Sequence, residues 1–255
     1  MAKARQFKEF LPAILSKPPG GTPATVIGGQ AVNYWCELAQ NKNPELATQK
    51  PFTSFDLDLV AHERSQTLAI AHATGLKLIE VGQAYSGSDR AALVDPKTKD
   101  TLIQILGSMY GVSDKVLGSN TADVVIEDSQ GVEHPAKIAN RTVLIVGKIA
   151  LALAPDNVRK PEDKEHDRHH LRLLILCMAT ATRELTEGIG KDHDERFVIK
   201  SLKALLKVIR SKDAVKVSSL DQNILWQNAI APEILRVDAS RYPSLAKFVS
   251  REIAP

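Results

Sequence analysis

The stretches Val26-Ile27-Gly28-Gly29 and Ser54-Phe55-Asp56-Leu57-Asp58-Leu59 decide the expected fold of this chain. The first is an apolar strand that runs into a double glycine and then into a predicted helix over residues 30–40. The second is a strand of alternating residues, and side chains two residues apart on a strand point to the same face. Asp56 and Asp58 are therefore expected to project together. The intervening apolar side chains are expected to face the core: Phe55, Leu57 and Leu59.

Both stretches carry groups that suit a metal–nucleotide site. Two carboxylates on one strand face suit Mg²⁺, which prefers hard oxygen ligands and substrate phosphates. Gly28 and Gly29 open the predicted helix, where unpaired backbone N–H groups and the helix dipole favour an anion. The sequence therefore predicts Mg²⁺ (or Mn²⁺) on Asp56 and Asp58, with phosphate at the glycines.

The order and spacing of these residues resemble the nucleotidyltransferase fold of the DNA polymerase beta superfamily. In that fold a Gly-Gly turn is followed by a helix, a loop and a Ser-x-Asp-x-Asp strand. The stretch PFTSFDLD at residues 51–58 is similar to the acidic strand of the bacterial and phage-borne group that includes AbiE-type toxins of abortive infection. The resemblance covers about residues 20–175. It implies an α/β (α+β) protein, a mixed-sheet nucleotidyltransferase core followed by an α-helical C-terminal domain.

The resemblance also implies an activity. Such an enzyme moves a nucleoside monophosphate from an NTP to a hydroxyl of RNA, for example a tRNA end, or of a protein. Gly28 and Gly29 would hold the triphosphate and Ser54 would contact a phosphate. Asp56 and Asp58 would be the catalytic residues that hold the metal. A toxin of this kind would have a cognate antitoxin or another regulatory partner.

A third acid is normally required, and its position is the main departure from the family pattern. In similar proteins it lies in a strand of the form hydrophobic-Asp-hydrophobic-Leu, and the matching stretch here, residues 102–106, carries Gln104 in its place. Glutamine has no charge for a second metal and cannot accept a proton. Asp123 is the alternative third acid. If Gln104 holds the position, the alternative functions are a catalytically impaired nucleotide-binding regulator or an RNA-binding module.

A lysine in a later apolar segment extends the resemblance. Residues 142–153 predict an apolar helix whose one cation is Lys148, and residues 159–167 then open the next helix. Related nucleotidyltransferases carry a Lys-Asp-x-x-Asp-like segment at this point. The resemblance implies that Lys148 binds the nucleotide by neutralising triphosphate charge. Ion pairing of these groups, or helix capping by Asp163, is the alternative.

The charge distribution and the positions of turn residues divide the chain into two parts. Residues 1–133 are the expected core, and residues 134–255 are the expected helical domain. The first part holds 12 Lys and Arg against 15 Asp and Glu, and the second holds 21 against 15. A net charge of +6 on the second part indicates an anionic partner or a solvated surface. The other predicted elements of the first part are a helix over 62–74 that ends at Gly75, and strands over 77–83, 91–94, 101–106 and 124–127. From about residue 136 onward the pattern predicts helices.

A predicted helix over residues 196–212 is amphipathic. Its apolar residues recur at spacings of three and four, which places them on one face. Five cations lie on the opposite face: Arg196, Lys200, Lys203, Lys207 and Arg210. The basic face is expected either to follow a phosphate backbone or to be a solvated surface.

Composition narrows the class of protein. No stretch approaches 18 uncharged apolar residues, so a membrane partner is not expected, and the cytoplasm is the expected compartment. Cys36 and Cys177 are too few for a disulfide framework and are expected to be buried thiols. His166 and His170 stand at helical spacing, but a third zinc ligand is not evident, so both are expected to be capping or solvated residues.

Overall fold

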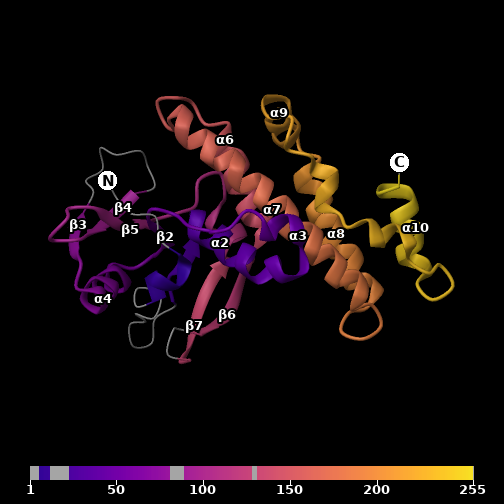
Figure 1. Ribbon diagram of the computed structural model, residues 1–255, viewed down its shortest axis with the longest axis horizontal. Coiled ribbons are helices and arrows are strands. Elements are labelled where there is room, and N and C mark those ends of the chain that lie inside the picture. Colours follow the sequence, from indigo (N-terminus) through magenta and orange to yellow (C-terminus); the bar gives the residue numbers. More distant parts are fainter. Residues whose placement is uncertain (1–5, 12–22, 81–88, 128–130, 255) are drawn as a thin grey trace.

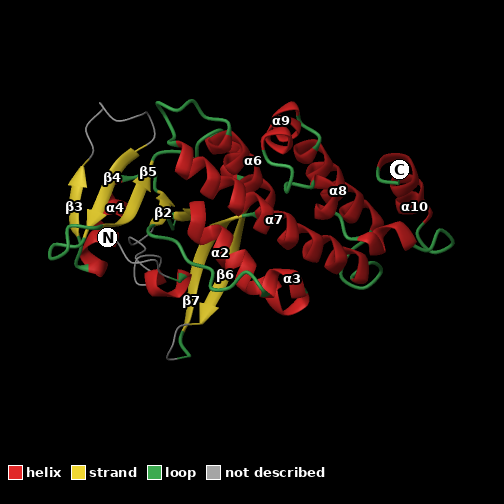
Figure 2. Ribbon diagram, turned by 45° about the horizontal axis from the view of Figure 1, so that its top comes forward, coloured by secondary structure: helices red, strands yellow, loops and turns green. Residues whose placement is uncertain are grey.

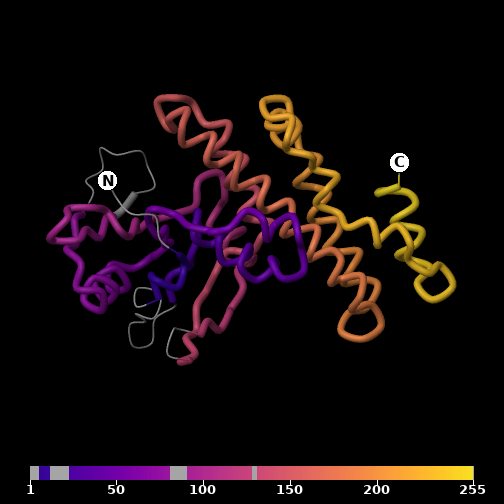
Figure 3. Tube along the Cα trace, in the orientation of Figure 1, coloured from indigo at the N-terminus to yellow at the C-terminus, as the bar shows by residue number. Residues whose placement is uncertain are grey.

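The computed structural model describes residues 6–11, 23–80, 89–127 and 131–254. A seven-stranded mixed sheet occupies the N-terminal half, and a mostly helical region follows it (Figure 1). The expected α/β class is therefore confirmed. The tube in Figure 3 shows the two halves at opposite ends of the molecule, with indigo and magenta segments at one end and orange and yellow segments at the other.

The strands are short, and helices separate some of them in the first part of the chain. The strands are β1 (Thr25–Ile27), β2 (Leu57–Val60), β3 (Lys77–Glu80), β4 (Asp89–Val94), β5 (Thr101–Leu106), β6 (Thr121–Glu127) and β7 (Glu133–Ala139). The helices are α2 (Gly28–Ala39), α3 (Pro44–Ala47), α4 (Arg64–Thr74), α5 (Asp114–Gly118), α6 (Arg141–Ala152), α7 (Pro161–Glu187), α8 (Glu195–Ile209), α9 (Lys212–Leu220) and α10 (Pro243–Glu252). Short 3₁₀ turns are η1 (Phe7–Phe10), η2 (Gln40–Lys42), η3 (Trp226–Ala229) and η4 (Pro232–Arg236).

The strand order β3-β4-β5-β2-β1-β7-β6 places the two diagnostic stretches in the middle of the sheet. β1 and β2 are antiparallel, with Ile27 opposite Asp58. β2 and β5 are parallel, with Asp58 beside Gln104. The end of β1, the start of β2 and the middle of β5 therefore meet at one place.

The alternation predicted for the acidic strand holds only from Leu57 onward. Leu57 and Leu59 are fully buried, as predicted, but Phe55 is 56% exposed. The prediction for Phe55 is wrong because β2 begins at Leu57, so Phe55 precedes the strand and does not follow its pleat. Strand 77–83 is confirmed for residues 77–80, and its last three residues lie outside the described residues.

The β6–β7 hairpin corrects the expected start of the helical part. β7 runs to Ala139, pairs antiparallel with β6 and parallel with β1, and the next helix begins only at Arg141 (Figure 2). Helix was expected from about residue 136, but Ala136 and Ile138 are alternate buried residues of a strand. The predicted division after residue 133 thus falls inside the hairpin, after the first residue of β7.

Helix α2 joins the sheet to the helical region. It packs against β1, β2, α6 and α7, and Trp35 Nε1 donates to the carbonyl oxygen of Ala139 at the end of β7, at 2.9 Å. Cys36 of α2 and Cys177 of α7 are free, fully buried thiols with 3.5 Å between their sulfur atoms, which confirms their predicted burial. This contact fixes α7 against the helix that opens at Gly28.

The predicted amphipathic helix is two helices in the structure. α8 ends at Ile209, and Ser211 caps the first turn of α9 by accepting from the Ala214 N–H at 3.1 Å. The apolar face of α8 is buried and its five predicted cations are exposed. None of the described helices is long and apolar enough to cross a membrane.

Candidate functional site

The site begins where β1 passes directly into α2. Gly28, the first residue of the helix, has a φ of +66°, a left-handed conformation that glycine adopts readily. A Cβ atom on Gly28 would lie 1.9 Å from Oδ2 of Asp58. The carboxylate of Asp58 therefore lies directly against the backbone at the start of α2. Two separate requirements, a positive φ and this close approach, explain the glycine.

Gly29 is surrounded by two polar side chains. A Cβ at this position would lie 2.7 Å from Ser54 Oγ and 3.1 Å from His170 Cε1. Ser54 is buried, and its carbonyl oxygen accepts from Gln30 Nε2 at 3.4 Å, which ties the segment before β2 to the first turn of α2. The structure thus brings together four residues that the sequence proposes: Gly28, Gly29, Ser54 and Asp58.

Gly28→Ala is expected to destabilise the protein by about 3 kcal/mol, because it adds a contact with Asp58 to the strain of a positive φ. Gly75 is a matched control, since it has the same φ of +66° and no heavy atom lies within 4 Å of the position that its Cβ would take. Gly75→Ala should cost about 1 kcal/mol. Urea unfolding of both variants measures the difference. Equal losses would contradict the close approach of Asp58.

Gln104 occupies the place beside the two aspartates. Its Nε2 donates to Oδ2 of Asp56 at 2.9 Å, and its backbone is in register with Asp58. Asp123 lies in the edge strand β6, with β7 and β1 between it and β2, and it is exposed. Of the two alternatives for the third position, the structure therefore places Gln104, and not Asp123, at the acidic pair.

Both aspartates are held where ionisation is unfavourable. Burial raises the pKa of Asp56, while Lys148 and Arg159 oppose the shift. Burial also raises the pKa of Asp58, to about 7, and repulsion from Asp56 acts in the same direction. Lys148 and Arg159 again oppose the shift. The pair therefore has less positive charge around it than two ionised carboxylates need, and a cation between them would be favoured.

Lys148 lies near the site but already has an anionic partner. Its Nζ is 2.7 Å from Oδ1 of Asp167, and Arg159 Nε is 2.9 Å from Oδ2 of the same carboxylate. Asp167 is fully buried and Lys148 is 5% exposed, so this is a buried ion-pair network and not a surface pair. Asp163 is not the N-cap of α7, because Lys160 holds that position. Asp163 lies in the first turn, with its Oδ2 3.9 Å from Nη1 of Arg159.

His170 is the site residue that sequence reasoning missed. It was expected to be capping or solvated, but it is 2% exposed, and its Nδ1 has no hydrogen-bond partner within the described part of the chain. Burial lowers its pKa well below the usual value, so the imidazole is neutral near pH 7. Its spacing was the available signal, because it falls in a buried 3-4-3-4 series on α7: Asp167, His170, Leu174, Cys177 and Ala181.

The residues fit Mg²⁺ with part of its shell supplied by the ligand. Within residues 6–11, 23–80, 89–127 and 131–254, no group of three or more His, Cys, Asp or Glu side chains is arranged to hold a metal. Asp56 and Asp58 provide two carboxylates, which matches the way Mg²⁺ binds to one or two carboxylates together with phosphates and water. A closed zinc site, which needs four protein ligands, does not fit.

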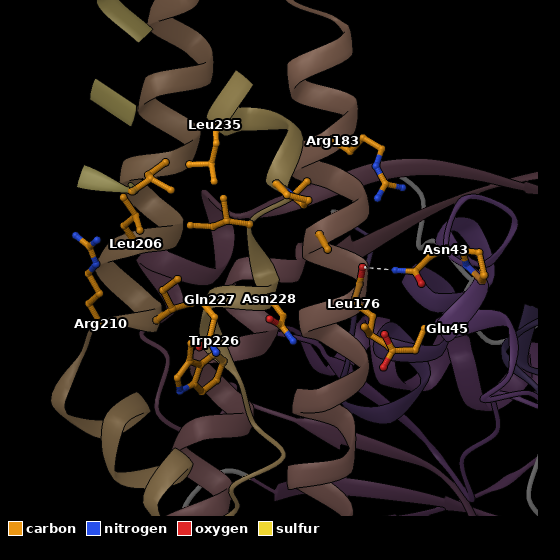
Figure 4. A pocket seen from close by; sticks show the side chains of 17 residues that line it. Asn43, Glu45, Leu176, Arg183, Leu206, Arg210, Trp226, Gln227, Asn228 and Leu235 are labelled. Carbon is orange, nitrogen blue, oxygen red and sulfur yellow. Dashed lines mark hydrogen bonds between the residues drawn. The ribbon is translucent and has the colours of Figure 1, made fainter. Parts of the chain in front are cut away.

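A pocket of about 820 Å³ lies away from these residues, in the helical region (Figure 4). It is bordered by α3, α7, α8, η3 and η4, and Trp226 and Leu206 contribute to its mainly apolar lining. Its two arginines are already paired, Arg183 with Glu233 and Arg210 with Glu252. Neither the acidic pair nor the first turn of α2 lines it, so this pocket and the acidic pair lie in different parts of the molecule. The perturbed pKa values at the acidic pair make that pair the stronger indicator of function.

Comparison with models of known protein families gives no match to this chain, and no curated protein matches its sequence. Function is therefore inferred from the geometry and chemistry of the site itself.

Proposed function

We propose that this chain binds an NTP with Mg²⁺ (or Mn²⁺) at the start of α2 and transfers the nucleoside monophosphate to a hydroxyl of RNA or protein. The observation that carries the proposal is the position of the Asp58 carboxylate against Gly28, with Asp56 beside it. Metal ligands and a helix N-terminus are thereby adjacent. That adjacency is what a metal-bound triphosphate requires.

The phosphates would bind at the first turn of α2. The first N–H groups of a helix have no partner within the helix, and the N-cap Ile27 provides no side-chain hydrogen bond to them. The Ser54 hydroxyl faces Gly29 and can donate to a phosphate oxygen. Lys148 and Arg159 contribute a positive field that also acts on Asp56 and Asp58.

The protein's part in the transfer is to hold and orient. A bound Mg²⁺ supplies Lewis-acid stabilisation of charge on the phosphate oxygens. Asp56 and Asp58 would hold the ion, and Gln104 orients Asp56 by donating to it. The acceptor hydroxyl oxygen bonds to the α-phosphorus, the bond from the α-phosphorus to its bridging oxygen breaks and pyrophosphate leaves. The proton of the hydroxyl passes to solvent water, since Gln104 cannot accept it. The exposed cations of α8 favour RNA as the acceptor.

A second candidate is supported by the Gln104–Asp56 hydrogen bond. A neutral amide stands where a third carboxylate would assist the nucleophile, and it cannot take the proton of the acceptor hydroxyl. The candidate function is a regulatory component, such as part of a toxin–antitoxin pair, that binds Mg–NTP without transferring it.

A label-transfer assay tests the first candidate. Each NTP labelled in its α-phosphate is incubated with Mg²⁺ or Mn²⁺ and with total RNA and protein from cells. Wild type is compared with Asp58→Ala, and with Asp123→Ala as the exposed control. Label on RNA or protein with wild type and Asp123→Ala, but not with Asp58→Ala, is expected. Absence of label from every NTP would contradict transfer and leave the binding function.

Gln104→Asp is expected to raise the transfer rate at least tenfold, because a general base contributes roughly 10²- to 10⁴-fold. Gln104→Leu, which removes the hydrogen bond to Asp56 without adding charge, serves as the control and should not raise the rate. The rate of label transfer at saturating NTP measures the effect. A rate with Gln104→Asp at or below that of wild type would show that the neutral residue does not limit transfer.

A further inference from the structure

We infer that His170 is a phosphate-contacting residue, which completes an anion subsite with the first turn of α2 and Ser54 by donating a hydrogen bond from Nδ1. The inference rests on the proposed function for the identity of the anion, a phosphate of the bound nucleotide. It assigns a role in binding to a residue outside the Gly-Gly and Asp-x-Asp stretches.

The first observation that supports the inference is a buried polar atom of His170 without a hydrogen-bond partner. His170 Nδ1 is buried and has no partner among the described residues. Leaving such a group unsatisfied costs about 1–3 kcal/mol, so native structures rarely keep one without a reason. A ligand that binds at the start of α2 would provide the missing partner.

The second support is the direction of the ring. Cε1, the carbon between the two ring nitrogens, is the His170 atom closest to the position that a Gly29 Cβ would take, at 3.1 Å. The polar edge of the imidazole therefore faces the first turn of α2. Ser54 Oγ approaches the same position at 2.7 Å. The Ser54 hydroxyl and the edge of the imidazole that carries both nitrogens thus meet at a helix N-terminus, where anions bind favourably.

The third support is the charge around the ring. After burial, the cations Lys148 of α6 and Arg159 before α7 favour the neutral form of His170. These two cations share one carboxylate, Asp167, so the group keeps a net positive charge, which suits a phosphate. A neutral imidazole with its proton on Nδ1 supplies one donor to the anion.

Isosteric substitutions separate this role from a structural one. In His170→Asn the side-chain nitrogen takes the place of Nδ1, in His170→Gln it takes the place of Nε2, and His170→Leu removes both. His169→Asn, one residue earlier on α7 and partly exposed, is the control. Binding of the four Mg–NTPs and of inorganic tripolyphosphate is measured by calorimetry, with a urea unfolding curve for each variant.

The affinity of each variant is expected to depend on whether it keeps a nitrogen in the place of Nδ1. His170→Leu and His170→Gln should weaken binding by about 10- to 100-fold, which is the worth of one hydrogen bond to a charged group. His170→Asn should stay within about threefold of wild type, and His169→Asn should be unchanged. Wild-type affinity in His170→Leu would overturn the inference, as would equal weakening in all three His170 variants in proportion to lost stability.

The same titrations separate this inference from the proposed function. If wild type binds tripolyphosphate in a manner that depends on His170 but binds no NTP, the anion subsite stands and the nucleotide function fails. If wild type binds an NTP equally well with and without His170, the nucleotide function stands and this inference fails. If wild type binds neither probe, both fail.

Discussion

Asp58→Asn is expected to abolish Mg²⁺-dependent NTP binding and, in metal-free buffer, to make the folded protein more stable above pH 7. Asparagine keeps the shape of the side chain against Gly28 but carries no charge. The folded protein disfavours the ionised carboxylate because burial, and then Asp56, raise its pKa to about 7. The variant therefore loses a proposed metal ligand and also a charge that the folded protein disfavours. Such opposing effects on stability and function are common at active sites.

The expected pH dependence follows from the direction of that shift. The usual pKa of an aspartate is 3.8, and that of Asp58 in the folded protein is about 7. Between these values Asp58 binds more protons in the folded state than in the unfolded state, so its contribution to the free energy of unfolding falls as pH rises from about 4 to 7. Above pH 7 the loss is complete, and its upper limit is roughly 4 kcal/mol.

Urea unfolding with a metal chelator at pH 5 and pH 8 measures this effect. Asp58→Asn should gain a few kcal/mol over wild type at pH 8 and much less at pH 5. Asp123→Asn, in the exposed edge strand β6, should match wild type at both values. A variant no more stable than wild type at pH 8 would show that the Asp58 carboxylate is not held in an unfavourable environment.

Lys148→Met is expected to destabilise the protein by about 3 kcal/mol, because it leaves the buried Asp167 carboxylate with Arg159 as its remaining cation. The pair of Lys42 and Glu184 is the matched control. It has the same separation of 2.7 Å, but its side chains are 62% and 40% exposed. Lys42→Met should cost less than about 1 kcal/mol. Equal costs in urea unfolding would show that burial does not set the strength of the Lys148 pair.

The double variant Lys148→Met/Asp167→Asn separates two roles of Lys148. It removes one positive and one negative charge, so the fold should recover part of its stability, and the field at Asp58 should change little. If Lys148 only balances Asp167, NTP affinity should be close to wild type. If Lys148 also contacts the triphosphate, affinity should stay low while stability recovers. Calorimetry with Mg–NTP distinguishes these results.

Local patterns were sufficient to predict the central part of the fold. The strand over residues 101–106 and the helix end at Gly75 are confirmed with the predicted bounds, because alternation and a left-handed C-cap are local signals. The meeting of Gly28 with Asp58 was implied by the family resemblance and not by local pattern, because it depends on the antiparallel pairing of β1 with β2. Gln104 falls beside Asp58 because β5 pairs with β2 in parallel register.

Features that depend on tertiary contacts were not predictable in the same way. Residues 133–139 form a strand because β1 and β6 both pair with them, which sequence periodicity over so short a run does not reveal. His170 is buried because α7 packs against α2, whereas the polar composition of the histidine cluster alone favours an exposed position. The 3-4-3-4 spacing through Asp167 and His170 was the stronger signal.

Calorimetric titration of the four NTPs, each with Mg²⁺ and with chelator, into wild type, Asp58→Asn and Asp123→Asn tests directly whether the acidic pair and the start of α2 form a metal–nucleotide site. Saturable binding of at least one NTP is predicted for wild type and Asp123→Asn, only with Mg²⁺, and at least about 100-fold weaker binding for Asp58→Asn. No NTP binding by wild type, or the same affinity in Asp58→Asn, would contradict the site.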